Sequence, residues 1–545
     1  MVLFWLQSPH LMSVDSYLYA EISKELVNSK QILFLYHLGS DWLDKPHFPF
    51  WVIGFIFKIL GVSPQSYLCA GFIFYLISIF YTYSLSKKLF NSDIAVLAII
   101  IYMSVLGVTI SIINLRAEGF LLGLIIPAIY YWFNYHQQSN INYYHLILGS
   151  IFSAAAVASK GLFVLIPIFI GFFTVWIYNK QWFKLISVKM IISYLLILLF
   201  LLPELISLYL QFDLHPEKLI FNQHSVSGLK WFFYGSQFGR FFNNGAITKS
   251  GGSYLFFVYN FIWLFLPWTI ITITAWIHLV KQTITNKCQH SHNLLLINAV
   301  FFVTFIIFSL SKFQLDFYIV ILFPFASITT AYYLNYLQQK KHIILKVLLK
   351  TQLALTIITI ALIIILFYYL NNNIVILLIE SGLLLLAIFM IMIVTNSDKI
   401  NDLNKTLLLT LLLAFTLFNI IMVFNNLYLG QYDVGYQLKK TIKEQNLNYK
   451  KIILYNLDSS LIDQILIHNP QVDLEQITDT NKIAINYQYH AILITKNNSE
   501  TINQVKQLCP QAKLLTQLST INCERLIYII TSNNKVYNNL NLYLI

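Results

Sequence analysis

Apolar runs of about 20 residues recur along most of this 545-residue chain, and they restrict it to one class of fold. An α-helix needs about 20 such residues to cross the hydrocarbon core of a bilayer, which is about 30 Å thick. Charged residues make up only 11% of the chain, against roughly 25% in a typical soluble domain. These features exclude a soluble globular enzyme and a disordered or fibrous chain. They predict an all-α polytopic membrane protein.

Twelve complete transmembrane spans are expected, with ends placed to within about two to four residues. They cover residues 66–86, 93–113, 116–134, 144–159, 162–178, 186–211, 254–280, 294–311, 316–337, 346–370, 374–395 and 405–426. Segment 1–12 is also apolar, but a helix of that length reaches only about 18 Å. The topology requires one more crossing before residue 13. We therefore expect a first helix shortened by a misplaced start codon, and a complete one would make thirteen spans.

Basic residues fall unevenly on the loops between these spans. One set of alternating loops carries thirteen of them, and the opposite short loops carry three, Arg116, Lys160 and Lys312. Because cytoplasmic loops hold the excess of Lys and Arg, the first set faces the cytoplasm, and segments 13–65, 212–253 and the chain after 426 face outward. The same rule accounts for the net charge of +12. No basic stripe interleaved with aromatic residues is present, so nucleic acid is not expected as a partner.

A change of composition after Asn425 divides the chain into two predicted domains. Residues 1–426 form a transmembrane domain, in which 13–65 and 212–253 are outer-face loops or interfacial helices. Residues 427–545 form a small α/β domain. In it, polar helical stretches (432–446, 459–468, 500–508) alternate with β-rich runs (451–455, 490–495, 525–531). Outside the cytoplasm Cys509 and Cys523 could form a disulfide, and two free buried thiols are the alternative.

Ionisable residues of both signs gather near helix ends on the outward face. The acids are Asp15, Asp41, Asp44, Glu118, Glu204, Asp213, Glu217 and Asp316, and the bases are Lys45, Arg116, Lys160, Arg240 and Lys312. Because charges at membrane depth cost free energy, their concentration favours a polar site there. Carboxylates can deprotonate an acceptor hydroxyl or amine, or hold a divalent cation. Lys and Arg can bind a lipid phosphate and stabilise it as a leaving group, although each residue could instead snorkel or pair structurally.

Several short motifs on this face resemble one family in order and spacing. They are Ser13-Val-Asp15-Ser-Tyr-Leu-Tyr-Ala-Glu21, Asp44-Lys45-Pro46 with Phe50-Trp51, Leu115-Arg116-Ala117-Glu118, Ser159-Lys160-Gly161, Leu266-Pro267-Trp268, and Ser309-Leu-Ser-Lys312 with Tyr318 and Pro324. The pattern is similar to that of the GT-C fold transferases that use polyprenyl-phosphate sugars. Family-39 protein mannosyltransferases and the aminoarabinose transferase of lipid A are the nearest by pattern. The resemblance covers roughly residues 11–337.

The resemblance implies roles for individual residues. Asp15 matches the loop aspartate needed for catalysis, placed to orient or deprotonate the acceptor. Glu118 stands where relatives usually carry a second aspartate, and Lys45 matches the lysine of a Lys-Pro-Pro element that contacts the donor phosphate. Arg116, Lys160, Arg240, Lys312 and Tyr318 are further candidate contacts to phosphate or sugar. The chain departs from the pattern at Ser16, where relatives often have Glu, at His47, which replaces the second proline, and in the longer side chain of Glu118.

These residues imply a membrane glycosyltransferase on the periplasmic face of a bacterial inner membrane. It would move a sugar from a polyprenyl-phosphate donor to a lipid, a glycan or a protein, and membrane lipids would surround it. No residue is assigned as a metal ligand, and a requirement for a divalent cation stays an open alternative. A transporter or flippase for a lipid-linked sugar is the competing class. It predicts charges through the midplane and paired broken helices, whereas here the charges concentrate at one face. An inactive relative that serves as an assembly scaffold is a third alternative.

Overall fold

The computed structural model describes residues 10–11, 13–29, 31–137, 140–249, 252–284, 291–340, 342–370, 389, 401–423, 432–447, 451–477, 491–497, 499–508, 512–521 and 537–544. The segment at 1–12 lies outside these residues apart from His10 and Leu11, and the expected span at 374–395 lies outside them apart from Phe389. The expected strand at 525–531 and both Cys509 and Cys523 also lie outside them. The chain divides into two compact units. Unit 1 holds residues 41–49 and 71–420, and unit 2 holds residues 3–40, 50–70 and 421–545.

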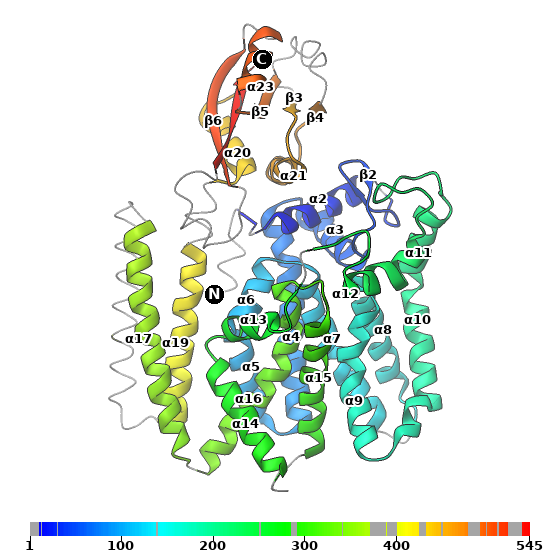
Figure 1. The fold of residues 1–545 in the computed structure, drawn as a ribbon, viewed down its shortest axis with the longest axis vertical. Helices are drawn as coiled ribbons and strands as arrows, with labels where there is room; N and C mark the ends of the chain where they lie inside the picture. Colours follow the sequence, from blue (N-terminus) through cyan, green and yellow to red (C-terminus); the bar gives the residue numbers. More distant parts are fainter. Residues whose placement is uncertain are drawn as a thin grey trace. The chain divides into compact units, whose positions relative to one another are not determined.

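Unit 1 is built from helices (Figure 1). In chain order they are α4 (Pro64–Leu89, which begins in unit 2), α5 (Ser92–Ser104), α6 (Leu106–Ile113), α7 (Ala117–Gln137), α8 (Tyr143–Lys160), η1 (Leu162–Val164), α9 (Leu165–Tyr178), η2 (Trp182–Ile186), α10 (Val188–Leu208), η3 (Tyr209–Asp213), α11 (Gly228–Lys230), η4 (Trp231–Gly239), α12 (Arg240–Phe242), α13 (Phe256–Leu264), α14 (Thr269–Ile284), α15 (Ser291–Leu310), η5 (Asp316–Leu322), α16 (Phe323–Gln339), α17 (Ile344–Leu370) and α19 (Asp402–Val423).

Helix α7 lies at the centre of unit 1 and packs against α8 and α9. Gly149 of α8 lets the two helices approach closely, because a β-carbon at this position would lie 2.9 Å from the indole of Trp132. The same indole donates a hydrogen bond to Ser153 Oγ at 2.9 Å. Trp132 is fully buried, so its N–H needs the partner that α8 supplies. This contact fixes α8, whose last residue is Lys160.

By length and composition, four helical segments among the described residues can each cross a bilayer unbroken: Pro64–Leu89, Trp182–Asp213, Ser291–Leu310 and Asp316–Gln339. Two bent helix pairs, α5 with α6 and α13 with α14, would raise that number to six. The helical bundle and the small C-terminal sheet confirm the predicted all-α membrane fold with an α/β domain.

The spans predicted at 93–113 and 254–280 are each formed by two helices that meet at a bend. The first bends by 57° at Val105, and the second bends by 116° between α13 and α14. Pro267 lacks the N–H that a continuous helix needs. The two breaks also bond to each other, because Leu106 N–H donates to Leu266 O at 2.9 Å and Trp268 Nε1 donates to Ser104 Oγ at 2.8 Å. Backbone groups freed by one break therefore find partners at the other, which hydropathy alone cannot predict.

Unit 2 combines a sheet with helices from both ends of the chain. Its elements are α2 (Val14–Ser29), β1 (Tyr36–His37), α3 (Phe48–Leu60), α20 (Val434–Glu444), β3 (Lys451–Tyr455), α21 (Ser459–His468), β4 (Leu474–Ile477), β5 (Ala491–Lys496), α23 (Ser499–Leu508), β6 (Lys513–Ile521) and β7 (Tyr537–Leu544); strand β2 (Ser40–Asp41) pairs with β1. Helix α3 begins just before residue 50, where this unit resumes.

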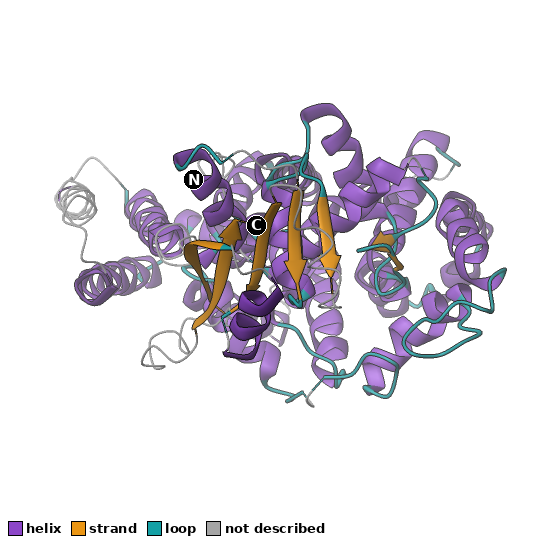
Figure 2. Ribbon diagram, turned by 90° about the horizontal axis from the view of Figure 1, so that it is seen from above, coloured by secondary structure: helices purple, strands orange, loops and turns teal. Residues whose placement is uncertain are grey.

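The five-stranded sheet has the order β4-β3-β5-β7-β6 (Figure 2). Strands β4, β3 and β5 are parallel, and β7 pairs antiparallel with both β5 and β6. Strands β3 and β5 are almost wholly buried, which agrees with their unbroken apolar runs. The predicted helices at 432–446, 459–468 and 500–508 and the strands at 451–455 and 490–495 are confirmed within the described residues. Strands β4, β6 and β7 were not predicted.

The N-terminal helix α2 belongs to unit 2 and packs on α21. Ser13 caps α2, since Ser16 N–H donates to Ser13 Oγ at 3.2 Å. Two charged residues of α2, Glu21 and Lys24, are buried and pair with each other at 3.3 Å. His37 pairs with Asp463 of α21 at 2.9 Å. The segment after residue 13 is therefore tied to the C-terminal domain by both apolar and polar contacts.

Candidate active site

An open pocket in unit 1 collects side chains from helix ends that are far apart in the sequence. It contains about 740 Å³ of space, including the space at its mouth. Its lining consists of Glu118, Leu121, Lys160, Phe163, Val164, Ser236, Gln237, Arg240, Phe241, Ile307, Phe308, Ser311, Phe313, Tyr318 and Ile321. Four of these, Glu118, Lys160, Arg240 and Tyr318, are residues that the sequence analysis assigned to the site. The structure thus brings half of the eight predicted residues to one pocket.

Lys160 is the centre of the first group of contacts. Its ammonium forms an ion pair with Glu118 and lies 3.7 Å from the centre of the Tyr318 ring. Glu118 is in the first turn of α7 and is buried, where the positive end of the helix dipole favours a carboxylate. The pair therefore places one acid and one base side by side in the wall of the pocket.

The turn after Lys160 is held by a residue that the sequence analysis missed. Helix α8 ends there because Gly161 takes a φ of 106°, which side chains other than glycine disfavour. Gln237 fills the space beside Gly161, where a β-carbon would collide with its amide. The Gln237 amide donates to Lys160 O at 3.3 Å and accepts from Phe163 N–H at 3.3 Å. No local sequence pattern marks Gln237, since its partners lie about 75 residues away.

Asp44 is the centre of the second group of contacts. One of its oxygens accepts a hydrogen bond from Lys45 Nζ at 2.9 Å, and the other pairs with the guanidinium of Arg240. Burial alone would raise the pKa of the Asp44 carboxyl, but the charges of Lys45 and Arg240 hold that pKa below its usual range. Asp44 is thus a carboxylate at neutral pH, and it positions both bases.

Positive charge is in excess around the pocket. Lys160 lies within electrostatic range of Lys45, Arg116 and Arg240 as well as Asp44. Four basic groups thus face the two carboxylates of Asp44 and Glu118. Because buried like charges repel, such an excess is costly unless an anion completes the site. A phosphate, with its several acceptor oxygens, is the anion that Arg and Lys together bind best.

The remaining predicted residues lie in other positions. Arg116 lines a neighbouring pocket that shares Glu118, and its guanidinium stacks 4.2 Å from the centre of the Phe317 ring. Lys312 has an exposed side chain and is absent from the lining of either pocket, although its neighbours Ser311 and Phe313 line the first. Asp15 stands in the first turn of α2, in unit 2.

His47, the departure from the Lys-Pro-Pro pattern, has a structural explanation. Its backbone N–H donates to Glu204 Oε2 at 2.9 Å, and its ring Nδ1 lies 3.1 Å from Glu204 Oε1. Both side chains are only 1% exposed. A proline at position 47 has no N–H and could not make the first bond. The His47–Glu204 pair anchors the loop that carries Asp44 and Lys45 to helix α10.

Apolar side chains make up most of the remaining lining of the pocket. They are the aromatic residues Phe163, Phe241, Phe308 and Phe313 and the aliphatic residues Leu121, Val164, Ile307 and Ile321. Pockets with apolar walls and a few converging polar groups are typical of small-molecule sites. The combination suits a ligand with a charged head and a hydrocarbon part.

Clusters of metal-ligating side chains were sought among the described residues. One group of three or more was found there, consisting of His10, Asp433 and His468, and it belongs to unit 2. In the pocket of unit 1 the carboxylates of Glu118 and Asp44 instead pair with basic side chains.

The sequence and the fold were also compared with known proteins. Residues 44–206 match the family model described as dolichyl-phosphate-mannose-protein mannosyltransferase. None of the curated protein sequences matches the chain. Two crystal structures of ArnT from Cupriavidus metallidurans are similar at 15% identity, over 99% of this chain and 95% of that chain. The TM-score is 0.69 for the structure bound to undecaprenyl phosphate and 0.68 for the apo structure.

The apo oligosaccharyltransferase of Archaeoglobus fulgidus is more distantly similar, with a TM-score of 0.44 and 11% identity. The match covers 90% of this chain and 66% of that chain. The ArnT match covers both the helical unit and the C-terminal domain, and it confirms the fold that the sequence motifs implied. The chain has the GT-C fold of membrane glycosyltransferases, with a segment at 44–206 that matches the protein mannosyltransferase family.

Proposed function

We propose that the chain is a membrane glycosyltransferase that moves a sugar from a polyprenyl-phosphate donor to an acceptor at the periplasmic face of a bacterial inner membrane. The observation that carries this proposal is the pocket of unit 1, where an excess of basic groups lies among aromatic and aliphatic side chains. The basic groups fit the phosphate of such a donor, and the apolar lining fits its prenyl chain. The ArnT structure with the same fold is bound to undecaprenyl phosphate, which supports this class of donor.

The basic residues act on the donor phosphate. Arg240, held by Asp44, and Lys160, beside Glu118, bind its oxygens, and Lys45 adds a third positive charge. As the bond between the anomeric carbon and the phosphate oxygen breaks, its electron pair goes to polyprenyl phosphate. The positive groups stabilise that leaving group, which carries an additional negative charge, more strongly than the singly charged phosphodiester of the donor, and this lowers the barrier. Tyr318 lines the same pocket, and in this proposal its phenol contacts the sugar.

The carboxylates act on the acceptor. By resemblance, Asp15 orients the acceptor hydroxyl or amine or takes its proton, and Glu118 serves as the second acid of the site. The nucleophile attacks the anomeric carbon once, so the transferred sugar is expected to have inverted configuration. The acceptor is a lipid such as lipid A, a glycan or a protein. A divalent cation could take part through these carboxylates.

A transfer assay with the full-length chain tests the proposal. The chain, in detergent, receives radiolabelled polyprenyl-phosphate sugars and a crude envelope extract. We expect label to move to an acceptor with the wild type and not with Asp15→Asn. The variant should elute in the same monodisperse peak as the wild type, because Asp15 is partly exposed.

Two outcomes would contradict the proposal. Equal transfer by Asp15→Asn would remove that residue from the mechanism. Absence of transfer for a range of sugars, combined with movement of the same lipids across vesicles that contain the protein, would identify a flippase instead.

A further inference from the structure

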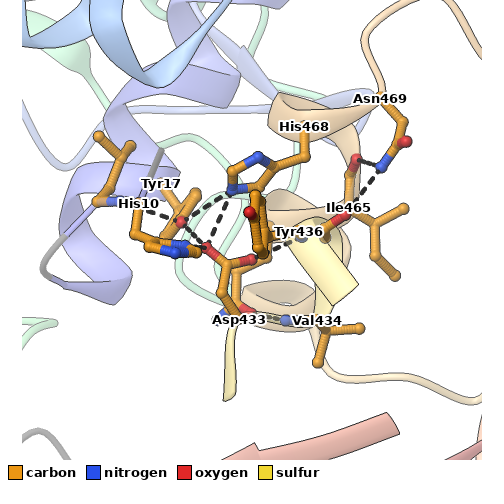
Figure 3. Close-up of polar contacts among 11 residues, drawn as sticks. His10, Tyr17, Asp433, Val434, Tyr436, Ile465, His468 and Asn469 are labelled. Atoms are coloured by element: carbon orange, nitrogen blue, oxygen red, sulfur yellow. Dashed lines mark hydrogen bonds and ion pairs between the residues drawn. The ribbon is translucent and has the colours of Figure 1, made fainter. Parts of the chain in front are cut away.

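Four polar side chains of unit 2 converge on one point in its interior (Figure 3). His10 Nδ1 lies 3.1 Å and His468 Nε2 lies 3.0 Å from Asp433 Oδ2. The Tyr17 hydroxyl also bonds to Asp433 Oδ2 and lies 3.2 Å from His468 Nε2. We refer to His10, Tyr17, Asp433 and His468 as the HYDH cluster.

The four members come from segments far apart in the sequence. His10 precedes α2, Tyr17 is in its first turns, Asp433 is the N-cap of α20, and His468 is the last residue of α21. The side chains of His10, Asp433 and His468 are only 8%, 6% and 3% exposed, and Tyr17 is 3% exposed. Polar groups buried this deeply cost free energy unless something satisfies them, so the convergence needs an explanation.

Hydrogen bonds alone satisfy the HYDH cluster poorly. A single oxygen, Asp433 Oδ2, faces three polar atoms, whereas the other oxygen accepts from Tyr436 N–H at 3.0 Å. The Tyr17 hydroxyl has one proton to donate and already accepts from Leu11 N–H at 3.1 Å. Two imidazole nitrogens and one phenol therefore compete for the same lone pairs. A cation at the centre would instead be coordinated by the lone pairs of the two imidazole nitrogens, the carboxylate oxygen and the phenol oxygen.

The donor set and its spacing fit a tetrahedral zinc-type ion. Imidazole nitrogen and carboxylate oxygen are zinc ligands, with bonds of about 2.0–2.2 Å. Such bonds place neighbouring ligand atoms about 3.3 Å apart in a tetrahedron. The separations of 3.0, 3.1 and 3.2 Å in the cluster are close to that value. The ligand atoms of His10, Asp433 and His468 all lie within 4.8 Å of one another.

We propose that the HYDH cluster is a structural binding site for a divalent zinc-type cation, with His10 Nδ1, His468 Nε2 and an Asp433 oxygen as three ligands and the Tyr17 hydroxyl at the fourth position. The cation cross-links the chain before α2 to α20 and α21. Because Tyr17 follows Asp15 by two residues, the site also fixes the turn that carries Asp15. The proposal stands on these four residues and does not depend on the transferase activity.

Metal counting on the full-length chain tests the site. The protein carries an affinity tag without histidines, is stripped with a chelator in detergent, is loaded with zinc chloride and is freed of unbound ion. Mass spectrometry of the elements then gives zinc per chain. The wild type should hold about one more zinc than His468→Ala and Asp433→Asn. The matched control His224→Ala should retain the wild-type value, because His224 is exposed in unit 1, where its ring Nδ1 lies 3.0 Å from the backbone oxygen of Glu217.

Cobalt supplies a second measurement that does not need the alanine variants to fold. Cobalt-loaded wild type should show the visible absorption of a tetrahedral ion with nitrogen and oxygen ligands, and His468→Gln should lack it. Tyr17→Phe should still bind cobalt but more weakly. Equal zinc content in the wild type and in the folded variants, or a wild type that binds no ion, would overturn the proposal. Cobalt affinity unchanged in Tyr17→Phe would remove Tyr17 from the ligand set.

Discussion

Asp44 in unit 1 and Asp433 in unit 2 are both carboxylates held between two cationic or potentially cationic groups, yet their surroundings differ. Asp44 is 21% exposed and lies between Lys45 and Arg240, of which Arg240 lines the open pocket. Asp433 is 6% exposed and is enclosed by His10, Tyr17 and His468.

Burial opposes ionisation at both sites, and the neighbouring bases nevertheless hold the pKa of both carboxyls below the usual range. Around Asp44 the positive charge exceeds the negative charge, which favours an anionic ligand. Around Asp433 the polar atoms close on one another. The first arrangement is typical of a binding site, and the second is typical of a structural link. Substitutions in unit 1 should therefore affect transfer, and those in unit 2 should affect stability.

The largest effect is expected for Glu118→Gln. The amide cannot accept a proton or carry the charge that pairs with Lys160, so transfer should fall by about 10²–10⁴-fold. The thermal midpoint should also fall, because Lys160 loses the buried carboxylate that pairs with it. Initial rates with saturating donor measure the loss, and Glu217→Gln, which changes an exposed acid outside both pockets, is the matched control. A Glu118→Gln enzyme with full kcat would show that Glu118 is only a structural partner of Lys160.

Asp433→Asn and Asp44→Asn form a pair that tests the comparison directly. Removing one partner of a buried charged cluster typically costs about 3–5 kcal/mol, so Asp433→Asn should destabilise unit 2 by that order. Asp44→Asn leaves its two bases near solvent, and it should instead raise the KM for the donor. Protease resistance of the full-length chain reports the stability, and donor titration reports KM. The two assignments would be reversed by one combination of results. Asp44→Asn would lose protease resistance but keep normal transfer, and Asp433→Asn would keep protease resistance but lose transfer.

The pH dependence of unit 2 should carry the signature of Glu21. Burial, opposed by the nearby Lys24, raises the pKa of this carboxyl from 4.5 to about 7. The unfolded chain therefore loses its proton first as pH rises, and stability should fall between about pH 4.5 and 7, by up to about 3 kcal/mol. Glu21→Gln should flatten this part of the stability curve and protect the chain at pH 8. Proteolysis rates at pH 5 and pH 8 measure the change, with Glu25→Gln as the less buried comparison.

Local sequence patterns predicted the parts of the molecule whose causes are local. Apolar runs of helical length predicted the bundle, and motifs at helix ends predicted that Lys160 and Glu118 belong to one site. They did not predict partners separated by long stretches of chain. His10 meets Asp433 across 423 residues, and His47 meets Glu204 across 157 residues. The bend between α13 and α14 escaped prediction because both helices are apolar, and an apolar run does not show where the backbone turns.

The smallest effect is expected for His47→Pro, which restores the family's Lys-Pro-Pro pattern. In the family pattern a proline stiffens this loop, whereas here two bonds from His47 to Glu204 hold it. The substitution removes both bonds and leaves Glu204 buried without them, which should cost about 1–3 kcal/mol and loosen Lys45. Combining it with Glu204→Leu removes the unpaired carboxylate and should recover part of that loss. Donor KM and thermal midpoint of the single and double variants measure the coupling. Strictly additive effects would show that His47 and Glu204 act independently, and the loop at Asp44 would then need another anchor.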